Sequence, residues 1–138
     1  MNQTAPFAFK LDPHSGVPVY RQIMDQVQAG LASGLLARGD QLPTVRQVAV
    51  DLEINPNTVL RAYRELEIRG VLDTQQGTGT FVSDRSAPQD DVERARKLDQ
   101  LANDVVSRAG AGGFTLREVV HALQQRLENA EPNRKRTK

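Results

Sequence analysis

Two helix-start signals follow one another closely in the first half of the chain. Thr44 with Gln47 three residues later fits a capping box, in which the two side chains satisfy unpaired amides of the first helical turn. Asn55 is a favoured N-cap, and Pro56 is tolerated at the first helical position because no amide hydrogen bond is lost there. The sequence therefore predicts a short helix, a tight turn and a second helix that runs to Arg69.

A glycine-rich segment follows the second predicted helix. Gly70 provides a helix stop, and residues 71–74 and 80–83 have the character of short strands on either side of a Gln-Gln-Gly-Thr-Gly turn. Two capped helices and a glycine hairpin within about 40 residues describe a winged helix-turn-helix, whose second helix is built to lie in a DNA major groove. Double-stranded DNA is therefore the predicted partner.

The second predicted helix has two faces of different character when its residues are placed about 100° apart. The face opposite the apolar one carries Asn57, Arg61 and Arg64, and Thr58 flanks them near the helix start. Asparagine and arginine are the side chains whose paired donors and acceptors match adenine and guanine edges, so this face is predicted to contact DNA. The apolar face predicts four core residues: Val59, Ala62, Tyr63 and Leu66.

Arg46 is a further candidate contact, in the first turn of the earlier helix. The helix dipole mildly disfavours a positive charge there, and a phosphate or base contact would compensate. Surface ion pairs are the alternative for all the cationic candidates. Arg46 could pair with Asp40 or Asp51, and Arg61 and Arg64 could pair with glutamates of their own helix.

The predicted wing carries Gly77, Thr78 and Gly79. In one interpretation the two glycines serve only a tight hairpin. In the other, they let Thr78 and the backbone approach a sugar-phosphate chain or the minor groove, and all three residues are candidate DNA contacts. The position of the hairpin, directly after the predicted reading helix, favours the second interpretation.

An extended segment and an amphipathic helix precede this region. Apolar residues recur every fourth position within residues 19–35, which predicts one helix. Phenylalanine and leucine alternate with smaller or polar residues over 7–11, which predicts a short strand or an extended arm. Residues 36–43 are predicted to form a loop because glycine and proline punctuate them.

Two further helical stripes follow a segment, residues 84–90, that has the composition of a linker. The first stripe runs over 91–108, and the glycine-rich run 109–113 breaks it. Thr115 and Glu118 then repeat the capping-box pattern, so the chain is predicted to end in a helical hairpin whose apolar residues dimerise. The candidate dimerisation residues are Val92, Leu98, Leu101, Val105, Leu116, Val120, Leu123 and Leu127.

The predicted fold class is mainly α with a small β-wing. It comprises a winged helix-turn-helix DNA-binding domain over 10–85, a two-helix dimerisation region over 88–130 and a disordered basic tail over 131–138. Packing of the two helices on their own winged domain is the alternative, but they expose more apolar surface than one small domain readily covers. A symmetric dimer would place two reading helices in successive major grooves, about 34 Å apart, on an inverted-repeat operator.

Charge argues weakly against a nucleic-acid partner. The net charge of the chain is +1, whereas DNA-binding domains are often strongly basic. Residues 10–85 hold eight basic and nine acidic side chains, so any basic footprint must be local. The alternative function is therefore a winged helix that binds only other proteins, and steep salt dependence of binding would identify DNA as the partner.

Several other classes of function are excluded. The chain has no cysteine, and His14 and His121 lie far apart with no nucleophile or metal-ligand spacing beside them, so no enzyme, metal site or cofactor is predicted. The N-terminus lacks the apolar run of a signal peptide, and no segment approaches the roughly 18 apolar residues of a membrane-spanning helix. A cytoplasmic protein without membrane contact is expected.

The sequence resembles the GntR family of bacterial transcription regulators over about residues 10–84. The segments that carry the resemblance are Pro18-Val19-Tyr20-Arg21-Gln22-Ile23, Leu42-Pro43-Thr44-Val45-Arg46, Asn55-Pro56-Asn57-Thr58-Val59 and Gly77-Thr78-Gly79-Thr80-Phe81-Val82. The start of the recognition helix and the short two-helix tail resemble the YtrA-type subfamily. This resemblance implies a homodimeric repressor of its own operon, often one that encodes an ABC transporter.

The resemblance also implies which residues contact DNA. The family's contacts carry over to Arg46, Asn57, Thr58, Arg61, Arg64 and Thr78. The sequence departs from the family in its wing, because many members have a basic wing whereas Gln75 and Gln76 are neutral. Many relatives add a large effector-binding domain that does not fit within 138 residues. Two alternatives for release from DNA stay open: a small-molecule effector bound at the dimer interface, or another cause.

Overall fold

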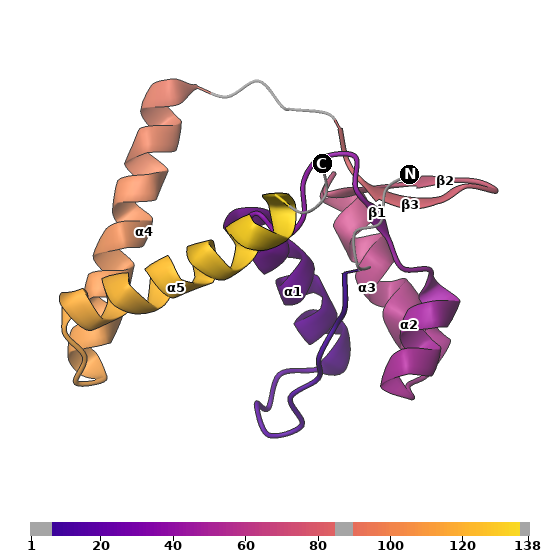
Figure 1. Ribbon diagram of the computed structural model, residues 1–138, viewed down its shortest axis with the longest axis horizontal. Helices are drawn as coiled ribbons and strands as arrows, with labels where there is room; N and C mark the ends of the chain where they lie inside the picture. The colour runs from indigo at the N-terminus through magenta and orange to yellow at the C-terminus, as the bar shows by residue number, and fades with distance from the viewer. Residues whose placement is uncertain (1–6, 85–89, 136–138) are drawn as a thin grey trace. The chain divides into compact units, whose positions relative to one another are not determined.

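The structure is a computed structural model that describes residues 7–84 and 90–135, with side chains up to residue 130. The described residues form five helices and three strands, which belong to two compact units (Figure 1). Residues 7–84 belong to the first unit, and α4 with most of α5 makes up the second. The elements are α1 (Val19–Ser33), β1 (Gln41–Leu42), α2 (Val45–Leu52), α3 (Pro56–Ile68), β2 (Leu72–Gln75), β3 (Gly79–Val82), α4 (Asp91–Ala111) and α5 (Leu116–Lys135).

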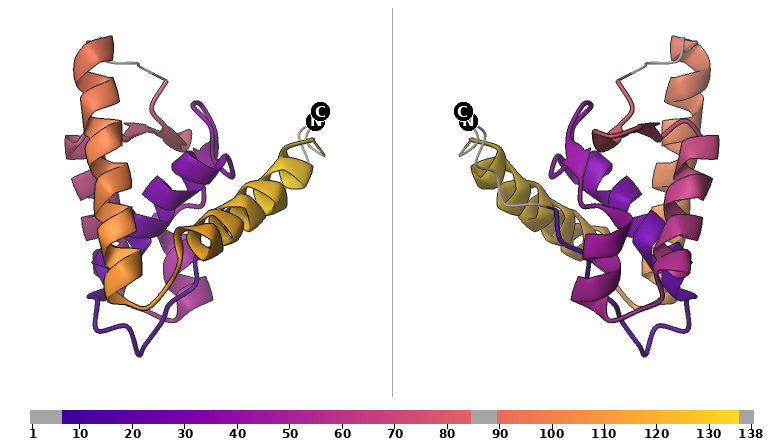
Figure 2. Two further views of the ribbon diagram at one scale, coloured as in Figure 1. Left: turned by 90° about the vertical axis from the view of Figure 1, so that its left-hand side faces the viewer. Right: turned by 90° about the vertical axis from the view of Figure 1, so that its right-hand side faces the viewer.

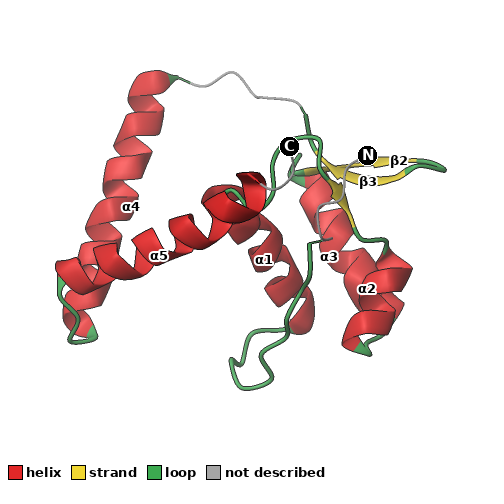
Figure 3. Cartoon of the chain, in the orientation of Figure 1, coloured by secondary structure: helices red, strands yellow, loops and turns green. Residues whose placement is uncertain are grey.

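The predicted fold class is confirmed. The chain is mainly helical, with a small antiparallel sheet in a winged helix-turn-helix unit and two C-terminal helices (Figure 3). The predicted linker over 84–90 falls mostly on residues 85–89, outside the described residues. Helix α5 continues to Lys135, so residues 131–135 of the predicted basic tail are helical, and 136–138 lie outside the described part of the chain.

Both predicted N-caps of the helix-turn-helix are present. The Thr44 hydroxyl accepts a 3.0 Å hydrogen bond from the Gln47 amide, and the Asn55 side chain accepts one of 2.8 Å from the Asn57 amide. The Gln47 side chain does not return to Thr44 and instead donates to Asp51 at 2.8 Å. The capping box is therefore half formed, and α2 and α3 begin where the sequence predicts.

The turn between α2 and α3 contains a backbone conformation that is energetically unfavourable for residues other than glycine. Glu53, at the C-cap of α2, has φ of 56° and ψ of 49°, the left-handed region. Its amide donates to the carbonyls at the end of α2, which terminates the helix there. The short reversal that separates the two helices thus depends on one strained residue.

The sheet has one strand more than the sequence predicts. Strand β1 lies within the predicted loop, because its two residues are too few to show an alternating pattern. The strand order is β1-β3-β2, and β3 is antiparallel to both neighbours. Strands β2 and β3 are displaced by one residue from the predicted 71–74 and 80–83, and they pair from Leu72 opposite Val82 to Gln75 opposite Gly79.

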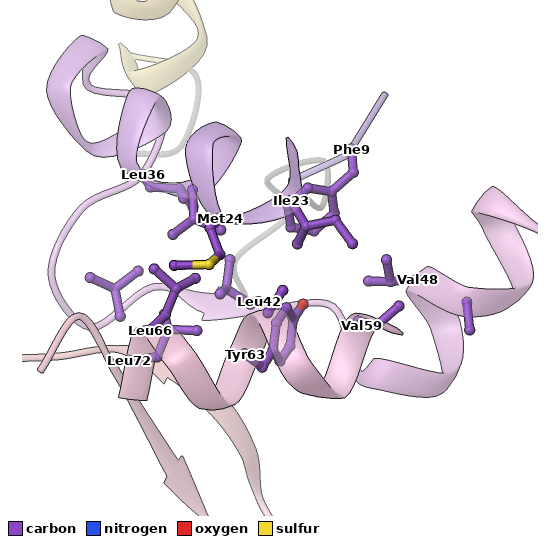
Figure 4. Packing of buried hydrophobic residues seen from close by; sticks show 14 residues of the cluster. Phe9, Ile23, Met24, Leu36, Leu42, Val48, Val59, Tyr63, Leu66 and Leu72 are labelled. Atoms are coloured by element: carbon purple, nitrogen blue, oxygen red, sulfur yellow. The ribbon is translucent and has the colours of Figure 1, made fainter. Parts of the chain in front are cut away.

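The core of the first unit lies where α1, α3 and the sheet meet (Figure 4). The four apolar residues predicted on α3 are all buried, which confirms that face of the helix. Tyr63 is one of them, and its hydroxyl donates a 2.6 Å hydrogen bond to the carbonyl of Pro43, just before α2. The largest fully buried side chains are Ile23, Met24, Leu66, Leu72, Val27 and Val59.

The N-terminal segment is an extended arm and not a strand. Phe9 packs into the core, while two glutamine side chains of α1 hold the backbone that follows it. The side-chain amide of Gln26 pairs with both the amide and the carbonyl of Lys10, and Gln22 does the same for Asp12. These side chains replace the neighbouring strand that an isolated extended segment would need.

Helix α4 continues further than the sequence predicts. It ends at Ala111 and not at Arg108, because a glycine inside a helix costs only about 1 kcal/mol relative to alanine. The stop is set by Gly113, which has φ of 83° while the Phe114 amide donates to the carbonyl of Ala109 at 2.8 Å. The following capping box is confirmed by reciprocal bonds between the residues at positions 115 and 118.

The predicted packing of α4 and α5 as a hairpin is not observed. The two helices diverge from their shared turn in every view (Figure 2). Their apolar stripes remain exposed, so neither helix covers the other. No helix in the described part of the chain combines the length and the apolar character needed to cross a membrane.

Candidate nucleic-acid interface

Helix α3 presents the predicted reading face opposite its buried face. Asn57, Arg61 and Arg64 are exposed, and Thr58 is half-buried beside them. Buried contacts to α1, α2 and the sheet fix the helix, so these polar side chains project from a rigid support. The structure brings the four residues to one side of α3, and their role as DNA contacts stays a prediction.

Arg61 has a partner that the sequence analysis did not identify. Its guanidinium carbon lies 3.8 Å from the centroid of the Tyr20 ring on α1, a cation–π contact. No ion pair joins Arg61 or Arg64 to a glutamate of α3 among the described residues. Tyr20 flanks the apolar stripe of α1, but no local signal in the sequence joins it to a residue so distant in the chain.

Arg46 lies exposed in the first turn of α2. The predicted alternative, an ion pair with Asp40 or Asp51, is not formed in the described part of the chain. Asp51 instead accepts the hydrogen bond from Gln47, and Asp40 accepts one of 2.9 Å from the Ala37 amide. Arg46 therefore carries its charge beside α3 without neutralisation by either carboxylate.

The wing glycines both have structural reasons. The Thr78 amide donates to the Gln75 carbonyl at 3.0 Å, and Gly77, the third residue of this turn, has the positive φ of 79° that favours glycine. A Cβ on Gly79 would lie 2.5 Å from the side-chain nitrogen of Gln41, which itself donates to the Thr78 carbonyl at 3.1 Å. Thr78 is exposed at the tip, and contact of this tip with DNA stays a prediction.

The segment before α2 is fixed to α3 through a buried phenol. Burial raises the pKa of Tyr63 above its ordinary value of 10.0, so the hydroxyl stays protonated and donates to Pro43. This bond links the start of α2, where Arg46 lies, to the middle of the reading helix. Among the described residues no group of three histidine or acidic side chains is arranged to hold a metal ion.

The predicted dimerisation residues form exposed apolar stripes on α4 and α5. Val105 is half-buried, and the other seven are exposed. Leu98 and Leu101 keep 60% of their surface accessible, and Leu116 and Leu123 keep 52%. Large apolar side chains in continuous exposed stripes are typical of an interaction surface.

Comparison with known proteins gives this geometry a family context. The family model described as bacterial regulatory proteins, gntR family, matches residues 19–82. The HTH-type transcriptional repressor YtrA of Bacillus subtilis (strain 168) is 42% identical over 77 residues, which cover 56% of this chain and 59% of that protein. The matched region therefore spans less than two thirds of the length of YtrA.

Two further similarities extend over nearly the whole length of the related proteins. The uncharacterized HTH-type transcriptional regulator YhcF of the same Bacillus strain is 37% identical over 114 residues, covering 80% of this chain and 90% of that protein. The solved structure of YtrA from Sulfolobus acidocaldarius, a GntR-family transcription factor, is 33% identical with a TM-score of 0.53 and covers 70% of this chain and 99% of that one.

Proposed function

The chain belongs to the GntR family of bacterial regulatory proteins, and we propose that it is a homodimeric repressor that binds an inverted-repeat operator. It is a DNA-binding transcriptional regulator and not an enzyme. Similarity to a protein named as a repressor supports repression, and not activation, as the proposed mode of regulation. The regulated genes are proposed to be its own operon, including an ABC transporter, as the resemblance to the YtrA type implies.

The observation that carries the proposal is the exposed polar face of α3. Asn57 and Arg64 project from a helix whose other face is buried, and the described residues neutralise neither Arg64 nor Arg46 with an ion pair. A helix of this kind fits the major groove, where such side chains can pair with base edges. The local cations also account for DNA binding by a winged unit whose overall charge is close to neutral.

Dimerisation is supported by the exposed stripes of α4 and α5. Full burial of a leucine or valine side chain stabilises a protein by about 1.5–3 kcal/mol, and these side chains still have about half of that burial available. A second copy presents the same apolar stripes, so a two-fold axis would cover both sets at once. In the proposed dimer, the two α3 helices would occupy successive major grooves, about 34 Å apart. We expect this dimer to act in the cytoplasm, where bacterial DNA lies.

Fluorescence anisotropy tests the proposal with labelled DNA from the region upstream of the protein's own gene. Titrations at two salt concentrations, with an unrelated duplex as competitor, separate specific from non-specific binding. We expect Arg64→Gln to weaken specific binding at least about fivefold, because a bidentate base contact contributes about 1–3 kcal/mol. Arg108→Gln on α4 is the matched control, since it removes an exposed arginine outside the proposed reading face.

Two outcomes would contradict the proposal. Equal affinity for the upstream region and the unrelated duplex would favour a winged helix that binds other proteins. If Arg64→Gln leaves specific binding unchanged, DNA is still the partner, but α3 does not read its bases as proposed.

A further inference from the structure

The contact between Tyr20 and Arg61 bears on how α3 uses its two arginines. Resting on the proposed DNA-binding function, we infer that Tyr20 positions Arg61 to contact the phosphate backbone beside α1, while Asn57 and Arg64 read bases. Tyr20 is then a positioning residue, and Arg61 contributes affinity without sequence preference.

The geometry of the contact leaves the donors of Arg61 available. The guanidinium carbon lies over the Tyr20 ring, 3.8 Å from the ring centroid. A guanidinium has five N–H donors spread around its plane, and contact of its carbon with one ring does not use all of them. Arg61 makes no hydrogen bond or ion pair with any other described residue. An anion outside the described protein is the group that these donors and this charge would bind.

The position of Arg61 on α3 favours a DNA phosphate, and not a base, as its binding partner. At about 100° per residue, Asn57 and Arg64 lie within roughly 20° of each other, whereas Arg61 lies roughly 40° beyond Asn57. The contact with Tyr20 shows that this displacement is toward α1. A helix in the major groove faces base edges along its centre line and the sugar-phosphate chains at its sides. Arg61 would therefore meet the groove wall.

The Tyr20 ring is a rigid support. It lies half-buried on α1, and this helix is fixed in the core through Ile23, Met24 and Val27. A guanidinium held on such a support loses less conformational freedom when it binds phosphate than a mobile one does. The contact uses the ring face, and the phenolic hydroxyl makes no hydrogen bond with the described residues. Phenylalanine should therefore replace tyrosine in this contact, whereas leucine should not.

The slope of affinity against salt concentration tests this inference. Each phosphate that the protein neutralises contributes about 0.9 to the steepness with which log K falls against log salt concentration. When the salt concentration rises from about 50 to 200 mM, binding of the wild type should therefore weaken about 3.5-fold more than binding of Arg61→Gln. We expect Arg61→Gln to lower affinity for the upstream DNA and for an unrelated duplex by the same factor. Tyr20→Leu should show a smaller loss of the same kind, and Tyr20→Phe should match the wild type.

Arg64→Gln is the matched control, because it removes the same charge from the same helix and should reduce the preference for upstream DNA. Thermal unfolding of each variant checks that the fold is retained. If Arg61→Gln changes the ranking of operators with single base-pair substitutions, Arg61 reads a base and the inference is wrong. If Tyr20→Leu folds and binds with the wild-type slope and affinity, Tyr20 does not position Arg61.

Failure of the proposed function gives a different result from failure of this inference. A wild-type protein without preference for upstream DNA contradicts the specific repressor role, yet the salt slope on unrelated DNA still tests Arg61. If Tyr20→Leu does not fold, Tyr20→Phe and Arg61→Gln decide the outcome. An Arg61→Gln slope equal to that of the wild type then overturns the inference.

Discussion

The side-chain amide of Gln41 donates a 3.1 Å hydrogen bond to the carbonyl of Thr78, joining β1 to the tip of the wing. The approach is possible because Gly79 has no side chain: a Cβ there would lie 2.5 Å from the Gln41 nitrogen. The neutral wing is therefore held in place by a contact between a short strand and a hairpin that are far apart in the sequence.

Gly79→Ala should detach this contact and strain the backbone. The φ of 139° at this position is one that alanine rarely adopts, and we expect the free energy of unfolding in urea to fall by about 1–3 kcal/mol. Gln41→Ala is the control, because it removes the hydrogen bond without the strain and should cost only about 0.5–1.5 kcal/mol. Equal stability of Gly79→Ala and the wild type would contradict this explanation of the glycine.

Glu53→Gly should stabilise the first unit. The left-handed backbone at this residue costs an ordinary side chain about 1–2 kcal/mol, and the greater freedom of glycine in the unfolded chain offsets part of that gain. We expect thermal unfolding to show a free energy of unfolding that is higher by about 0.5–1 kcal/mol, with DNA affinity unchanged. Glu53→Ala should show no such gain because alanine keeps the strain. A lower melting temperature for Glu53→Gly would show that the carboxylate contributes more than the strain costs.

Tyr63→Phe should lower stability at neutral pH and change its dependence on high pH. Loss of the hydroxyl leaves the Pro43 carbonyl without its 2.6 Å hydrogen bond, which should cost about 1–2 kcal/mol. Because burial raises the pKa of Tyr63 in the folded state, its stabilising contribution is complete below pH 10 and is lost as the pH rises through the raised pKa. The free energies of unfolding of Tyr63→Phe and the wild type, measured in urea between neutral and alkaline pH, should therefore converge above pH 10. Parallel curves would contradict this role of the phenol.

Leu101→Glu should dissociate the proposed dimer. Leu101 is 60% exposed on α4, so the monomer should tolerate the charge, whereas an apolar interface should not. We expect sedimentation velocity to show a monomer at concentrations where the wild type is dimeric, together with weaker operator binding. Val50→Glu is the matched control, since Val50 is 65% exposed on α2 outside the proposed interface. An unchanged dimer in Leu101→Glu would place the interface elsewhere.

Local signals in the sequence predicted the elements that depend on neighbouring residues. Thr44 and Asn55 cap α2 and α3 through amides two or three residues away, and Glu118 reaches the amide of Thr115 in the same way. The buried face of α3 also followed from spacing along one helix. These features could be predicted because their partners lie within one helical turn.

The elements that the sequence did not predict depend on partners far away in the chain. Strand β1 exists because β3 pairs with it, and neither of its residues carries a pattern of its own. The contact of Arg61 with Tyr20 joins residues on different helices, so a helical wheel placed Arg61 on the reading face without revealing what holds it there. By itself the sequence determined where the helices start and which face of α3 is buried, because short-range hydrogen bonds and periodicity decide both. Only the tertiary structure decided how the exposed side chains are held, because that depends on elements brought together by folding.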